Sequence, residues 1–215
     1  MEKVACSWSG GKDSCYALMQ TLQQGSVLTA LVNMMNENGI ISRSHGLPLP
    51  VLQQQATAMD IPLIAIPTSW ADYEKNFIDT LLNIKSRFGV DAMVFGDIDL
   101  QAHRDWEEMV CAKAAIQARL PIWQKNRKEL VYEMLHKGIE AMIVSCNTVM
   151  GEDFLGLMIS EPLIPELEKI GVDVCGENGE FHTVVIDCPL FENKINLPAF
   201  HKIKHEEYWF LQWKD

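Results

Sequence analysis

The sequence lacks several features, and each absence excludes a class of protein. Within its 215 residues no apolar run approaches the roughly 18 consecutive residues that a membrane-spanning helix needs. None of its six cysteines forms a Cys-X-X-Cys pair, which argues against a zinc site and against a disulfide framework. A strand is expected to begin within three residues of Met1, which leaves no room for a signal peptide. These absences predict a cytoplasmic protein without a membrane segment.

Positive charge is also scarce. The chain has 18 Lys and Arg residues against 29 Asp and Glu residues, which gives a formal net charge of −11. Binding to tRNA or DNA depends on Lys and Arg side chains that neutralise phosphates. The densest basic stretch, residues 194–204, is modest. Nucleic acid is therefore not expected as a partner.

What the sequence does contain is a glycine-rich loop near its start. The loop consists of Ser9, Gly10, Gly11, Lys12, Asp13 and Ser14. It follows a short apolar run and precedes apolar residues at helical spacing, so we expect it to join a strand to a helix. Glycines let a ligand approach the backbone, and the free N–H groups at a helix start attract an anion.

The polar residues of this loop favour a phosphate as that anion. Lys12 adds a positive charge, and the hydroxyls of Ser9 and Ser14 can donate to phosphate oxygens or complete a metal shell. Asp13 would be repelled by a polyphosphate unless it faces away, caps the helix or meets the phosphates through Mg²⁺.

Apolar strands alternate with helices along the first two thirds of the chain. The expected strands lie at residues 4–8, 27–35, 61–66, 92–95 and 141–144. This alternation predicts an α/β fold with a right-handed, parallel, doubly wound sheet, in which residues 141–144 would form the fifth strand.

Beyond about residue 145 the pattern changes to shorter elements with several glycines and prolines. We therefore predict a phosphate-binding domain at residues 1–145 and a smaller α+β domain at residues 146–215. Residues 206–213 are expected to add an edge strand. Their aromatic side chains leave two alternatives, core packing or the surface of a homodimer.

Further candidate site residues follow the strands. Gly96 and Asp97 come directly after the fourth apolar run, and the ligands of an open α/β sheet lie beyond the carboxyl ends of its strands. Asp97 is thus placed to hold Mg²⁺ or substrate. His45 either contacts a phosphate or is an ordinary surface histidine. Arg104 and Glu107 share a helical stripe, where they would contact phosphate and an amine or form an exposed pair, and spacing alone favours the exposed pair.

A second glycine-rich turn lies in the C-terminal part of the chain. It consists of Gly176, Glu177, Asn178, Gly179, Glu180, Phe181, His182 and Thr183. Two glycines and two carboxylates in one turn suit recognition of a cation or a polar substrate close to the backbone. Turn chemistry alone also explains the glycines, so both interpretations stay open at this point.

The first loop resembles the PP-loop of the N-type ATP pyrophosphatases, Ser-Gly-Gly-Xaa-Asp-Ser, and it is not a Walker A loop. Residues further along the chain are similar to those of the diphthine–ammonia ligase family. They are Gly96, Asp97, Ile98, Arg104, Trp106, Glu107, Val110, Cys111, Pro121, Ile122, Trp123, residues 174–177 and residues 187–191. The resemblance thus extends from the loop nearly to the C-terminus.

This resemblance implies a PP-loop fold of the HUP-like type and an AMP-forming ligase that uses ATP and Mg²⁺. Members of the family adenylate the carboxylate of diphthine, a modified histidine on elongation factor 2. Ammonia then displaces AMP and leaves an amide. The implied partners are ATP, ammonium and elongation factor 2 or another carboxylate-bearing acceptor.

The resemblance also implies roles for the residues of this chain that match the family's motifs by position. Lys12, Asp13 and Asp97 would be catalytic, and Asp13 and Asp97 would meet Mg²⁺ through the phosphates. The residues implied to bind ATP are Ser9, Gly10, Gly11, Lys12, Asp13, Ser14, His45 and Gly96. Those implied to bind the substrate are Arg104, Glu107, Glu177, Asn178, Glu180 and His182. Glu177 and Glu180 would face the substrate cleft, where acids suit a trimethylammonium group.

Three positions depart from the family's pattern, and all lie in the substrate half. Asn178 stands where the family has glycine, His182 where it has an acid, and Leu157 where we expect Arg or Lys. ATP activation is untouched by these changes, whereas the identity of the acceptor stays open. Two other functions are considered: a PP-loop enzyme that adenylates an RNA base before sulfur transfer, and a regulatory protein that holds ATP without turnover.

Overall fold

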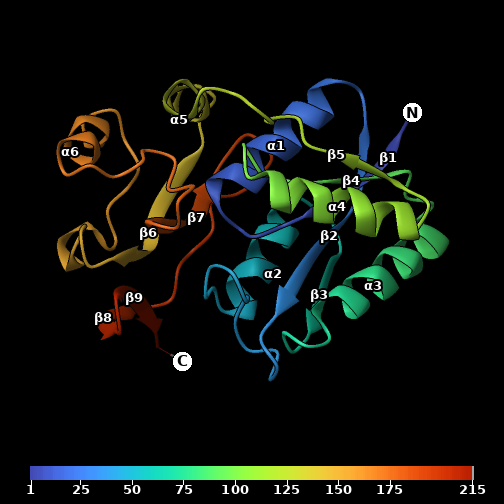
Figure 1. The fold of residues 1–215 in the computed structure, drawn as a ribbon, viewed down its shortest axis with the longest axis horizontal. Helices are drawn as coiled ribbons and strands as arrows, with labels where there is room; N and C mark the ends of the chain where they lie inside the picture. The colour runs from blue at the N-terminus through green and yellow to red at the C-terminus, as the bar shows by residue number, and fades with distance from the viewer. Residues whose placement is uncertain (215) are drawn as a thin grey trace.

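The computed structural model describes residues 1–214 and contains two sheets (Figure 1). The first part of the chain contains β1 (Lys3–Ser7), α1 (Lys12–Gln23), β2 (Val27–Met35), α2 (Leu49–Ala58), β3 (Leu63–Pro67), α3 (Tyr73–Phe88), β4 (Ala92–Val94), α4 (Gln101–Lys113) and β5 (Gln117–Arg119). The second part contains α5 (Arg127–His136), β6 (Glu140–Asn147), the 3₁₀ helix η1 (Glu152–Phe154), α6 (Leu163–Lys169), β7 (Phe181–Asp187), β8 (Phe200–His205) and β9 (Tyr208–Trp213).

Five parallel strands in the order β3-β2-β1-β4-β5 form the first sheet. Residues of α1 and α2 pack on one face of this sheet, and residues of α3 and α4 pack on the other. The prediction of a doubly wound parallel sheet is therefore confirmed. The strand order reverses between β1 and β4, so the loops that follow these two strands leave the sheet side by side.

The second sheet has four antiparallel strands in the order β7-β6-β9-β8, and it corrects two predictions. Residues 141–144 belong to β6 of this sheet and do not continue the parallel sheet. Their apolar run is buried among other elements, and periodicity does not distinguish such a strand from a buried parallel one. The fifth parallel strand is β5, which escaped prediction because two of its three side chains are polar.

The last predicted strand is also placed differently. β9 pairs with both β6 and β8, so residues 206–213 do not form an edge strand. Leu211 is buried, and Trp209 and Trp213 pack against the core. For Trp209 and Trp213 the structure therefore shows core packing, whereas Tyr208 is exposed.

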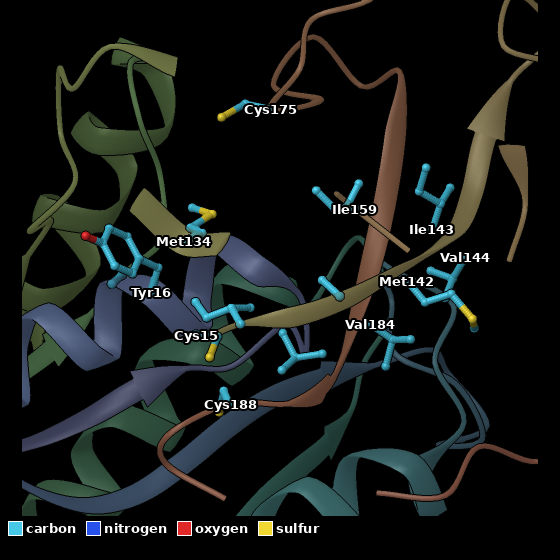
Figure 2. Close-up of a cluster of buried hydrophobic side chains, with 14 of the residues drawn as sticks. Cys15, Tyr16, Met134, Met142, Ile143, Val144, Ile159, Cys175, Val184 and Cys188 are labelled. Atoms are coloured by element: carbon cyan, nitrogen blue, oxygen red, sulfur yellow. The ribbon is translucent and has the colours of Figure 1, made fainter. Parts of the chain in front are cut away.

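The two sheets share one hydrophobic core through α1. Figure 2 draws part of it: Cys15 of α1 lies near Cys188, which follows β7, and Val184 of β7 faces the same cluster. All six cysteines are buried free thiols. Among residues 1–214 no helix has the length and apolarity to cross a membrane.

Hydrogen bonds also attach β7 to the glycine loop. The Val185 N–H donates to the Gly10 carbonyl at 2.8 Å. Gln55 of α2 is completely buried, and its amide donates to the carbonyls of Gly10 (3.0 Å) and Val185 (2.8 Å). The second sheet and α2 therefore hold the glycine loop in place through hydrogen bonds to the Gly10 carbonyl.

Candidate active site

A cavity of about 930 Å³ lies beyond the carboxyl ends of β1 and β4, a size typical of ligand sites. Its walls come from the glycine loop, the segment after β2, the first turns of α3 and α4, and the turn before β7. The predicted site residues that line it are Ser9, Lys12, Asp13, Ser14, His45, Gly96, Asp97, Glu107, Glu177, Asn178 and His182. Both parts of the chain thus contribute to one site.

The glycine loop leads directly into α1. Gly10 has a φ of 84°, in the left-handed region that favours glycine. The N-cap residue of α1, Gly11, has no side chain to cap the helix, and the Lys12 N–H donates to the Thr183 hydroxyl, so the N–H groups of Asp13 and Ser14 are the ones that remain available to an anion. The Ser9 and Ser14 hydroxyls lie 3.0 Å apart at the cavity wall.

Gly96 is needed for a different reason, which is close packing. A Cβ atom at this position would lie 2.6 Å from the backbone nitrogen of Ser14. The end of β4 therefore approaches the start of α1 so closely that only glycine fits there. This contact fixes the position of Asp97 relative to the glycine loop.

Lys12 is almost completely buried, with 3% of its surface exposed. Its ammonium donates to both carboxylate oxygens of Asp13 (3.0 and 2.8 Å) and to the Cys175 carbonyl (2.5 Å). Burial, the largest single effect, would lower the pKa of Lys12, but the charge and hydrogen bond of Asp13 together with other acidic groups nearby outweigh it, and the net pKa is raised. The Lys12 N–H also donates to the Thr183 hydroxyl at 3.1 Å. The turn before β7 therefore positions a permanent cation.

Two histidines cover the loop. The ring of His45 lies 4.6 Å from that of His182, and its Nδ1 pairs with the Thr183 carbonyl at 2.8 Å. A carbonyl only accepts, so Nδ1 carries the proton and donates. Burial lowers the pKa of His45 to about 4 and that of His182 to about 3, so both are neutral at pH 7. His45 is thus not an ordinary surface histidine.

The cavity is also rich in carboxyl groups. Asp97 accepts a hydrogen bond from His103 Nδ1 at 2.7 Å, and it is also hydrogen-bonded to Glu107. Burial raises the pKa of Glu107 to about 11, with Asp97 adding to the shift, so Glu107 is neutral and donates to Asp97. Burial, with the charge of Asp13 adding to it, raises the pKa of Glu177 to about 7.

Two predictions about this region do not match the structure. The expectation that Arg104 and Glu107 form an exposed pair is wrong, because Glu107 is 4% exposed and faces the cavity. Arg104 instead donates to Glu108 at 2.7 Å and lies over the Trp123 ring. It is not among the described residues that line the cavity.

Glu180 also turns away from the cavity that the structure describes. Its carboxylate accepts from the backbone N–H groups of Asp173 (3.2 Å) and Asn178 (3.0 Å), so it closes the turn. Of the two acids predicted in this turn, only Glu177 lines the cavity in the described chain.

Sequence reasoning missed a residue that organises the site. Arg127 of α5 donates to Asp99 (2.6 and 2.8 Å), to Asp173 (2.5 Å) and to Asn178 Oδ1 (3.2 Å). It therefore connects the loop after β4 with the turn before β7. Its position at the start of α5 gave no signal, because its partners lie 28 to 51 residues away in the sequence.

The aromatic lining of the cavity was missed as well. The rings are Trp70, Tyr73, Phe77, Phe95 and Trp106. Four of the rings lie directly before α3 or in the first two turns of α3 and α4. Each of these helices follows a strand of the parallel sheet. That placement was the available signal, but apolar periodicity does not distinguish rings that line a cavity from rings that fill the core, and Phe77 does both.

The fold and this site together define an ATP-binding protein of the PP-loop class, with a glycine loop at the reversal point of a parallel sheet. Sequence models of the diphthamide synthase N-terminal and C-terminal domains match residues 2–118 and 126–214. The chain therefore belongs to the diphthamide synthase family, and the predicted resemblance is confirmed.

Individual relatives agree with this assignment. The chain is 30% identical to diphthine–ammonia ligase of Mus musculus and 29% identical to that of Homo sapiens, over 94% of this chain and 85% of each relative. A solved structure from Methanocaldococcus jannaschii, described as a predicted subunit of tRNA methyltransferase, shares 15% identity, with a TM-score of 0.48. It covers 87% of this chain and 98% of its own, and is too distant to inform function.

Proposed function

We propose that the protein is an ATP-dependent, AMP-forming ligase that adenylates a carboxylate for displacement by ammonia. The observation that carries the proposal is the single cavity in which the glycine loop and Lys12 face the acid-bearing turn before β7. Because the chain belongs to the diphthamide synthase family, diphthine on elongation factor 2 is the first acceptor to test. The departures at Leu157, Asn178 and His182 keep another carboxylate in consideration.

Each part of the site would have a defined task. The N–H groups at the start of α1 and the Lys12 ammonium would hold the phosphates and stabilise the charge that develops on them. A carboxylate oxygen of the acceptor would attack the α-phosphorus, and pyrophosphate would leave. Ammonia would then attack the acyl carbon, and AMP would leave with that carboxylate oxygen. Free ammonium is the proposed nitrogen source: its deprotonated form, ammonia, is the nucleophile, and the protons released pass to water, so no residue needs to act as a base.

Mg²⁺ is part of the proposal, and the residues present fit it. No group of three or more metal-ligating side chains occurs in the described chain, so a dedicated protein cage is absent there. Mg²⁺ commonly uses one or two carboxylates together with substrate phosphates, and Asp13 and Asp97 both line the cavity. The ion would neutralise phosphate charge that these two carboxylates would otherwise repel.

Other predictions stay proposals. Arg104 and Glu180 remain candidates for substrate binding only if the acceptor reaches beyond the cavity. A cytoplasmic location and a homodimer are likewise proposed. A division into two domains is proposed too, but it would lie before β6 and not at residue 145, because β6 belongs whole to the second sheet. The buried positions of all six cysteines support the ligase over a sulfur-transferring RNA enzyme, because no described thiol is exposed as a sulfur carrier.

Product analysis tests the proposed function. Purified protein is incubated with ATP, Mg²⁺ and ammonium, with and without elongation factor 2 that carries diphthine. We expect AMP and pyrophosphate only when the acceptor is present. AMP with cell extract but never with diphthine would preserve the chemistry and reject that acceptor, whereas ADP and phosphate would reject the chemistry.

A further inference from the structure

The ammonium of Lys12 is fully engaged within the protein. An ammonium has three N–H groups, and that of Lys12 has three oxygen acceptors: both carboxylate oxygens of Asp13 (3.0 and 2.8 Å) and the Cys175 carbonyl (2.5 Å). The ring of Phe181 lies next to it, with 5.4 Å between Nζ and the ring centroid. A phosphate oxygen can therefore bind to this ammonium only if one of the acceptors is released.

The two acceptor groups differ in how readily they can leave. The Asp13 side chain rotates about its own bonds, is 21% exposed and lines the cavity. An approaching phosphate would also repel its carboxylate. The acceptor on Cys175 is a backbone carbonyl of a residue that is 1% exposed. Asp13 is thus the group that would turn away, and the Cys175 carbonyl is the fixed point from which Lys12 would reach a phosphate.

The carboxylate of Asp173 holds the Cys175 peptide in place. Its Oδ1 accepts the Cys175 N–H at 3.1 Å, and its Oδ2 accepts the Glu177 N–H at 3.2 Å. The Cys175 thiol donates to the Arg127 carbonyl at 3.0 Å, which attaches the same residue to α5. One carboxylate therefore closes the turn around the residue whose carbonyl binds Lys12.

Arg127 in turn holds this carboxylate. Its Nη1 donates to Asp173 Oδ2 at 2.5 Å and to Asn178 Oδ1 in the same turn at 3.2 Å. Its Nε and Nη2 donate to the two carboxylate oxygens of Asp99 at 2.8 and 2.6 Å, a bidentate pairing that fixes the plane of the guanidinium. Asp99 lies in the loop after β4, so Arg127 fixes the turn relative to the parallel sheet.

We propose that Arg127 is a positioning residue for Lys12. It acts through the carboxylate of Asp173, which in turn holds the Cys175 carbonyl against the ammonium. The inference rests on the proposed function, because the phosphates of ATP are the ligands that Lys12 would meet. Arg127 is not among the described residues that line the cavity. It would therefore change the affinity for ATP without touching ATP.

The lysine ammonium itself reports this positioning without any ligand. In protein labelled with ¹⁵N-lysine, Lys12→Met identifies the side-chain NMR signal of the buried Lys12 ammonium by its loss. We expect this signal to shift or broaden in Arg127→Met and to stay unchanged in Lys128→Met. Lys128 is the next residue of α5, and its ammonium pairs with Glu168 near the surface at 2.8 Å. An unchanged Lys12 signal in Arg127→Met would overturn the proposal.

A double-mutant cycle tests whether Arg127 acts through Lys12. Calorimetry gives the affinity for a non-hydrolysable ATP analogue with Mg²⁺ in wild type, Arg127→Met, Lys12→Met and the double variant. We expect Arg127→Met to weaken binding about tenfold in the wild-type background and less than about twofold in the Lys12→Met background. Equal losses in the two backgrounds would show that Arg127 acts by its charge or by general stability, and would overturn the proposal.

Two milder variants separate geometry from charge and from loss of folding. Arg127→Lys keeps the charge but cannot hold Asp99 and Asp173 at once, so we expect affinity for the ATP analogue to fall about fivefold. Asp173→Asn keeps an acceptor for the Cys175 N–H and weakens the pairing with Arg127, so its affinity should fall similarly. Circular dichroism verifies folding. Wild-type affinity in both variants would reject the positioning role alone, whereas a wild-type protein that binds no ATP analogue would reject the proposed function.

Discussion

The two ends of the cavity are built in opposite ways. The loop end is made of consecutive residues at one strand–helix junction, and it offers backbone N–H groups and the ammonium of Lys12. The aromatic end gathers side chains from α3, α4 and the loop after β4, and it is acidic. The loop end should therefore be sensitive to backbone geometry, whereas the aromatic end should respond to side-chain chemistry.

The largest effect is expected where the two ends meet. Gly96→Ala would place a Cβ atom 2.6 Å from the Ser14 nitrogen and force the end of β4 away from α1. We expect AMP formation to fall by at least about 100-fold and stability to fall by about 2–3 kcal/mol. Activity assays and urea denaturation measure the two losses.

Gly25→Ala is the control for this substitution. It introduces strain at a φ of 92°, but nothing lies within 4 Å of the added Cβ atom. We expect a stability loss of about 1 kcal/mol and normal activity. If Gly96→Ala behaves like this control, the close approach of β4 and α1 does not fix the site.

The second prediction concerns the charge of the loop end. Lys12→Ala removes the ammonium that faces the cavity, so we expect affinity for the ATP·Mg²⁺ complex to fall by about 10- to 100-fold. The protein should remain folded, as measured by circular dichroism. Calorimetry with a non-hydrolysable ATP analogue gives the affinity, and an unchanged value would reject the phosphate-loop assignment.

The third prediction tests whether the second sheet supports the loop end. Gln55→Leu removes bonds to the carbonyls of Gly10 and Val185 and leaves the buried indole N–H of Trp8, now 2.8 Å from the Gln55 oxygen, without its partner. We expect a stability loss of about 2–3 kcal/mol in urea denaturation. Gln53→Leu on the exposed side of α2 is the control and should change stability little. Similar curves for both variants would contradict the support role.

The smallest expected effect is a pH dependence at the acidic side of the cavity. Burial and neighbouring charge raise the pKa of Glu177 from 4.5 to about 7, so the folded protein binds its proton more tightly than the unfolded chain. The contribution of Glu177 to stability should therefore decrease as the pH rises from about 4.5 to 7, and Glu177→Gln should remove this contribution. Relative to wild type, the variant should gain about 1 kcal/mol between pH 5 and pH 8, after allowance for partial solvent screening.

Urea denaturation at both pH values measures this gain. Glu192→Gln replaces an exposed acid and serves as the control, with no expected difference between the two pH values. If the difference in unfolding free energy between Glu177→Gln and wild type is the same at both pH values, the carboxyl group of Glu177 is not held in an unfavourable environment.

The contrast between the loop end and the aromatic end of the cavity also explains which features could be predicted from the sequence. The glycine loop and the doubly wound sheet were predictable, because a contiguous motif and apolar periodicity are local signals. Glu107 was misjudged as half of an exposed pair, since only the packing of α4 against α3 decides which helical face lines the cavity. The parallel sheet was misassigned at its fifth strand because polar β5 gave no periodic signal while buried β6 gave a strong one.

Residues that act through the backbone or across long sequence separations were the hardest to predict. Cys175 contributes a carbonyl to Lys12, a role that no side-chain pattern encodes. Glu180 matched the family motif as well as Glu177 did, yet the turn uses its carboxylate to bind its own N–H groups. Motif matching identified the segment correctly, but the geometry of the turn decided which acid faces the cavity.

An isotope-transfer experiment tests the central claim most directly. The carboxylate of the acceptor, diphthine on elongation factor 2, is labelled with ¹⁸O and incubated with the protein, ATP, Mg²⁺ and ammonium. If the carboxylate is adenylated, ammonia displaces AMP together with one labelled oxygen, so mass spectrometry should find ¹⁸O in the phosphate of AMP. Label in inorganic phosphate with formation of ADP, or amide formation with unlabelled AMP, would contradict adenylation at this site.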